Sequence, residues 1–73
     1  MISDPNTAKQ ISQVMLDVAG RLNESTALVK DHCSPEESKA YSRAVGPVLW
    51  QLFSEVLDPI FMKHPSLKPP NYE

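Results

Sequence analysis

His32 and Cys33 are adjacent in the sequence, and Glu36 and Glu37 follow shortly after them. Imidazole, thiolate and carboxylate groups are the side chains that bind zinc in proteins. A stable zinc site uses about four such ligands at regular spacing, and this sequence holds one Cys and two His in all. We therefore predict no metal site and no cofactor, and we interpret this stretch as a polar turn.

One alternative for these residues remains open. If two copies of the chain pair in antiparallel orientation, His64 of one copy comes close to His32 and Cys33 of the other. Together with Glu36, these side chains could then form a ligand or metal site across a dimer. Catalysis by Cys33 would require a partner base with a group to orient it, and the sequence shows none. We predict no catalytic residue, and hence not an enzyme.

The strongest structural signal lies between residues 41 and 61. Apolar residues recur there in two adjacent rows with a spacing of four, which indicates a helix with an unusually broad apolar face. A face this broad predicts contact with more than one partner helix. The first row is Tyr41, Val45, Leu49, Phe53, Leu57 and Phe61, and the second is Ala44, Val48, Leu52, Val56 and Ile60.

A first helix is predicted from Pro5 to near Asp31. Asp4 can cap its N-terminus, and Pro5 suits the first helical position because its missing N–H is not needed there. Apolar residues then follow at steps of three and four, from Ile11 to Val29, interrupted only by Ser25. Val14, Ala19 and Leu28 widen this stripe. Gly20 is the weak point of this helix and indicates either close backbone approach at the Ala19–Gly20 pair or a local bend.

Ser34 and Glu37 have the spacing of a capping box, with Pro35 at the first helical position between them. The second helix is therefore predicted to start at Pro35. Only a few residues connect it to the first helix, which is typical of antiparallel neighbours. Inside it, Pro47 predicts a kink in a continuous helix, and His64 before Pro65 predicts its end.

These signals give a domain organisation of three parts. Residues 1–4 are expected to be a disordered lead, and residues 5–64 a helical hairpin domain. Residues 65–73 are rich in proline and are predicted to form an extended tail. Leu67 and Tyr72 could attach this tail to the helices.

Charge and composition argue against several functional classes. The chain has 9 acidic and 7 basic residues with a net charge of -2, and its basic residues do not cluster, which argues against nucleic-acid binding. Its apolar runs are far shorter than the roughly 20 residues of a membrane-spanning helix. A secretory signal is not evident, and a single thiol fits a reducing compartment, so we predict a cytoplasmic protein.

The small size of the chain predicts self-association. A core built from 73 residues rarely contributes more than about 3 to 5 kcal/mol of net stability. A single cysteine excludes an intrachain disulfide as reinforcement. We predict an all-α fold in which two helical hairpins, each kinked at Pro47, form a four-helix bundle homodimer. The alternative is a three-helix monomer, in which Pro47 breaks the second helix.

The predicted function is a small, non-enzymatic interaction protein that contacts itself and possibly another protein, in a biological process that the sequence does not identify. The alternative is a ligand- or metal-binding helical dimer with its site at the turn. Trp50 lies opposite the main apolar row, so it is either an interface anchor or a core residue reached through the Pro47 kink. The predicted dimer or partner interface consists of Tyr41, Val45, Leu49, Trp50, Phe53, Leu57 and Phe61.

Overall fold

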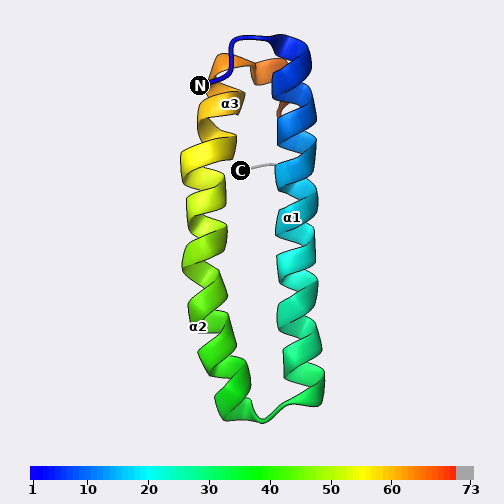
Figure 1. The fold of residues 1–73 in the computed structure, drawn as a ribbon, viewed down its shortest axis with the longest axis vertical. Helices are drawn as coiled ribbons and strands as arrows, with labels where there is room; N and C mark the ends of the chain where they lie inside the picture. The colour runs from blue at the N-terminus through cyan, green and yellow to red at the C-terminus, as the bar shows by residue number, and fades with distance from the viewer. Residues whose placement is uncertain (71–73) are drawn as a thin grey trace.

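The computed structural model describes residues 1–70, which fold into an antiparallel helical hairpin (Figure 1). One arm is a single long helix, and the other is a succession of helical segments that runs back beside it. This arrangement confirms the all-α hairpin and differs from the three-helix alternative. The segments are α1 (Pro5–His32), α2 (Pro35–Gln51), the π-helical η1 (Leu52–Leu57), α3 (Asp58–Lys63) and the 3-10 turn η2 (Pro65–Leu67).

The first arm matches the predicted helix closely. The Asp4 carboxylate accepts a hydrogen bond from the backbone N–H of Thr7 at 2.8 Å, and α1 continues for 28 residues to His32. Gly20 is exposed, and a Cβ built on it would have no atom within 4 Å. The close backbone approach considered for this glycine is therefore absent, since Gly20 faces open space within an unbroken helix.

The turn between the arms is fixed by the predicted capping box. The Glu37 N–H donates to Ser34 Oγ at 3.2 Å, and the Ser34 N–H donates to Glu37 Oε1 at 3.0 Å. Both bonds satisfy N–H groups that a helix start leaves without intrahelical partners. The chain therefore reverses direction at Cys33 and Ser34, as the sequence predicts.

The second arm leaves α-helical hydrogen bonding at η1 rather than at Pro47. α2 continues through Pro47 to Gln51, and only then does the bonding widen, with the Asp58 N–H donating to the Phe53 carbonyl. Gly46 favours a continuous helix here, because the steric restriction on a residue before proline acts partly through that residue's Cβ, which glycine lacks. Pro59 follows η1 as one of the first residues of α3, where its missing N–H carries little cost.

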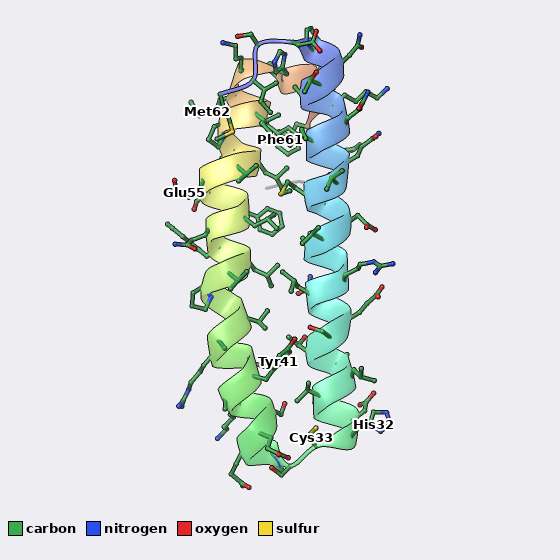
Figure 2. All side chains as sticks on the ribbon, in the orientation of Figure 1. His32, Cys33, Tyr41, Glu55, Phe61 and Met62 are labelled. Carbon is green, nitrogen blue, oxygen red and sulfur yellow. The ribbon has the colours of Figure 1, made fainter. Side chains whose placement is uncertain are left out.

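The buried core lies at the open end of the hairpin, far from the turn. It consists of Ala8 from α1 with Leu57, Ile60 and Phe61 from the other arm. Ile2, before α1, and Leu67, after α3, pack against this cluster. Figure 2 shows Phe61 pointing between the two arms.

The two terminal segments are held by specific contacts. His64 Nε2 lies 2.8 Å from the Ile2 carbonyl oxygen, so the N–H tautomer at this nitrogen donates to it and ties residues 1–4 to α3 (Figure 1). Pro65–Leu67 forms a 3-10 turn where an extended tail was predicted, because this turn brings Leu67 onto the core. The predicted contact of Tyr72 lies outside the described residues.

Across residues 1–70, no helix is both long and apolar enough to cross a membrane.

The open space around Gly20 leads to a prediction on stability. Gly20→Ala should raise the free energy of unfolding by up to about 1 kcal/mol, because alanine favours the helix over glycine. Gly46→Ala is the matched control, since Gly46 also has no atom within 4 Å of a built Cβ. Its new Cβ would crowd Pro47, so it should gain less than Gly20→Ala. Urea denaturation of both variants measures the difference, and equal gains would contradict the explanation.

Candidate functional site

The predicted interface residues divide into three groups in the structure. Val45, Leu57 and Phe61 are buried inside the hairpin, whereas Tyr41, Leu49 and Phe53 are half-buried. Trp50 is 69% exposed, so within one chain it is not a core residue. A surface for another molecule must therefore be built from residues that the hairpin leaves uncovered.

The possible ligands at the turn do not meet within one chain. His32 and Cys33 are exposed at the turn, as Figure 2 shows, while His64 lies at the open end and contacts the Ile2 carbonyl oxygen. Within residues 1–70, the structure contains no group of three or more His, Cys, Asp or Glu side chains placed to hold a metal ion.

Charge at the turn is used to cap a helix. The pKa of the Glu37 carboxyl is lowered, mainly by the hydrogen bond from the Ser34 N–H and secondarily by hydrogen bonding with the Ser34 side chain. At the other end of the hairpin, the pKa of Asp4 is lowered chiefly by the Thr7 side-chain hydroxyl and then by the Thr7 N–H. These carboxylates stabilise helix starts.

A polar contact links the arms in the half of the hairpin near the turn. The hydroxyl groups of Ser25 and Tyr41 are 2.8 Å apart, and Ser25 Oγ also donates to the Leu22 carbonyl oxygen at 2.6 Å. With its only proton given to Leu22, the Ser25 oxygen accepts the Tyr41 O–H. This bond joins α1 to α2 between the core and the turn, and Figure 2 shows Tyr41 reaching between the two helices.

The same side of the hairpin carries a set of uncovered apolar side chains. Val14, Leu28 and Val48 are 50%, 61% and 50% exposed, Val18 is half-buried and Ala44 is exposed. Each precedes an inward-facing residue by one position, as Ser25 does, so each is rotated about 100° from the core. The two antiparallel arms are related by an approximate two-fold axis perpendicular to the plane that contains them. Side chains rotated from the core by the same angle and in the same sense therefore lie on the same face of the hairpin, whichever arm they come from. We name these five residues the valine face.

Trp50 lies on the other side of the hairpin. It follows the half-buried Leu49 by one residue, as Gly46 follows Val45 and Gly20 follows Ala19. The rotation relative to the core is therefore opposite to that of the valine face. We name the side that carries Trp50, Gly46 and Gly20 the tryptophan face.

The sequence prediction did not separate these two faces. Val14 and Leu28 were read as broadening the inward stripe of the first helix, and Val48 as part of the second apolar row. The available signal was the breadth of the apolar pattern itself, because one opposing helix covers only a narrow stripe. The Ser25–Tyr41 bond could not be located, since it depends on the alignment of the two arms.

Comparison with known proteins gives no relative, since no family model, curated protein or solved structure matches the chain. The functional proposal below accordingly depends on the surfaces of the hairpin.

The Ser25–Tyr41 bond gives a prediction. Tyr41→Phe should lower the free energy of unfolding by about 1 kcal/mol, which is typical of a lost hydrogen bond between side chains. The same substitution in a Ser25→Ala background should cost clearly less, because the partner hydroxyl is already gone. Thermal and urea denaturation of the four proteins measure the coupling. A cost that is unchanged in the Ser25→Ala background would show that the bond contributes nothing.

The lowered pKa of Glu37 predicts loss of stability in acid. A carboxyl whose pKa is lower in the folded state stabilises fully above its unfolded pKa, ordinarily 4.5 for Glu. This contribution falls as the pH drops through the lower folded-state value. Glu37→Gln keeps a hydrogen-bond acceptor but cannot titrate, so its unfolding midpoint should depend less steeply on pH below 4.5 than that of the unmodified protein. Parallel pH profiles in the two proteins would contradict the role of Glu37.

Proposed function

We propose that this is a small, non-enzymatic cytoplasmic interaction protein whose hairpin pairs with a second copy to form a four-helix bundle. The supporting observation is that the two arms form a single layer of helices (Figure 1). Both arms carry exposed apolar side chains. Protein domains generally bury apolar helix stripes between two or more packed layers. A second hairpin supplies the missing layer.

The size of the exposed surface supports this proposal. The chain exposes 5370 Å², whereas a compact monomer of 8.2 kDa is expected to expose roughly 4500 Å². A standard protein interface takes about 800 Å² from each partner. The surface is therefore large enough to support a specific dimer.

The interior of a single hairpin is correspondingly small. Leu57 and Ile60 are the largest side chains that are completely buried within the described residues. Along α2, the inward-facing Val45 is buried, but its inward-facing neighbours Tyr41 and Leu49 are only half-buried. Association with a second copy would place further apolar contacts where the hairpin alone has few.

Within this proposal, Trp50 lies outside the shared core. Its large ring is exposed and belongs to the residue type most enriched at binding hot spots. We assign it to contact with another protein once the dimer has formed.

Dimerisation predicts a dependence on protein concentration. Light scattering over a wide concentration range should give a mass near twice 8.2 kDa at the upper end. The thermal midpoint should rise with concentration, because association stabilises the folded state by mass action. A monomer with an unchanging midpoint across the whole range would refute the proposed function.

A further inference from the structure

We infer that the second copy binds on the valine face, and that the tryptophan face points away from the dimer partner. This inference rests on the proposed dimer and specifies which side of the hairpin forms it. Its basis is the distribution of apolar and charged side chains over the two sides.

Both arms contribute exposed apolar side chains to the valine face. Val14 and Leu28 come from α1, and Val48 comes from α2, with Val18 and Ala44 completing the face. A four-helix bundle requires this arrangement, because each helix of one hairpin must contact the other hairpin. On the tryptophan side, the exposed large apolar side chains are Trp50 and Met62, which follows the buried Phe61, and both come from the second arm.

Charge gives an independent reason to favour the valine face. Alongside it, the positions that precede inward-facing residues hold one basic and one acidic residue, Arg21 and Glu37. Both are engaged within their own chain, since Arg21 Nε lies 3.7 Å from Asp17 Oδ2 and the Glu37 carboxylate accepts from the Ser34 N–H. This side therefore presents no excess of one charge to a second copy. The corresponding positions on the tryptophan face hold Lys9, Lys30 and Lys39, and no acidic residue within 5–51. Apposing two copies through that face would bring like charges together and oppose association.

The surface shape on the valine side also suits a partner. A shallow hollow lies there on α1, lined by Arg21, Glu24, Ser25 and Leu28. It adjoins the Ser25–Tyr41 bond, which joins the two arms. An apolar side chain of the second copy can enter this hollow and would then cover Leu28, which lines it.

Two substitutions on the same helix provide the test. Val48→Glu places a charge on the valine face, and Trp50→Glu places the same charge on the tryptophan face. Both native side chains are exposed in the hairpin, so neither change disturbs its core. Val14→Glu repeats the first change on α1, and circular dichroism checks that each variant stays helical.

The dimer dissociation constant, measured by analytical ultracentrifugation, distinguishes the outcomes. Val48→Glu and Val14→Glu should raise it at least about tenfold, with Trp50→Glu changing it much less. A dimer disrupted by Trp50→Glu but not by the two valine variants would overturn the inference and leave the proposed function standing. An unmodified chain that stays monomeric would refute both. If Val48→Glu loses helicity, the dissociation constant of Val14→Glu distinguishes the two outcomes.

The single tryptophan gives a second readout without mutation. Acrylamide quenching of Trp50 fluorescence should stay constant as the unmodified protein passes from monomer to dimer with increasing concentration. A marked fall in quenching on dimerisation would show that the partner covers the tryptophan face, and would overturn the inference.

Discussion

The π-helical segment η1 determines whether the second arm can keep its apolar row against α1. Residues spaced by four on an α-helix drift by about 40° per step, so Phe61 would be rotated by about 160° from Val45 on an unbroken helix. It would then point away from α1. Hydrogen bonds over five residues in η1 include one extra residue, which reverses about 100° of this drift. Leu57 and Phe61 are consequently buried.

This change in register is what joins the two arms at the open end. Leu57, Ile60 and Phe61 reach Ala8, where the small side chain lets the other arm approach closely. Ile2, before α1, and Leu67, after α3, then pack against the cluster. Without the change in register, the terminal segments would have a much smaller apolar surface on which to pack.

The sequence predicts those parts of the fold that depend on neighbours along the chain. The caps at Asp4 and Ser34 and the end at His64 are local, because each involves residues a few positions apart. The π segment could not be predicted in this way. The drift of the apolar row was evident and was attributed to kinks at the prolines. The structure shows a further adjustment, which is the widening of the helix before Pro59.

The same distinction applies to the candidate site. The breadth of the apolar pattern indicated that one opposing helix was insufficient, but the division of exposed residues into two faces depends on how the arms are aligned. Ser25 and Tyr41, for example, form a hydrogen bond that depends on this alignment, although they are far apart in sequence. Val14 and Val48 each precede an inward-facing residue, and this position places both of them on the valine face.

The functional consequence follows from the difference between these two sides. A layer of two helices has two broad surfaces, and a single dimer contact can cover one of them. On the valine face, exposed apolar side chains of both arms lie beside one basic and one acidic residue, with no excess of one charge, which suits self-pairing. The tryptophan face combines one large aromatic side chain with lysines, which would oppose pairing with a second copy and, under the proposal, suits a chemically different partner. One small hairpin can thus present a surface for its own copy and a separate surface for another protein.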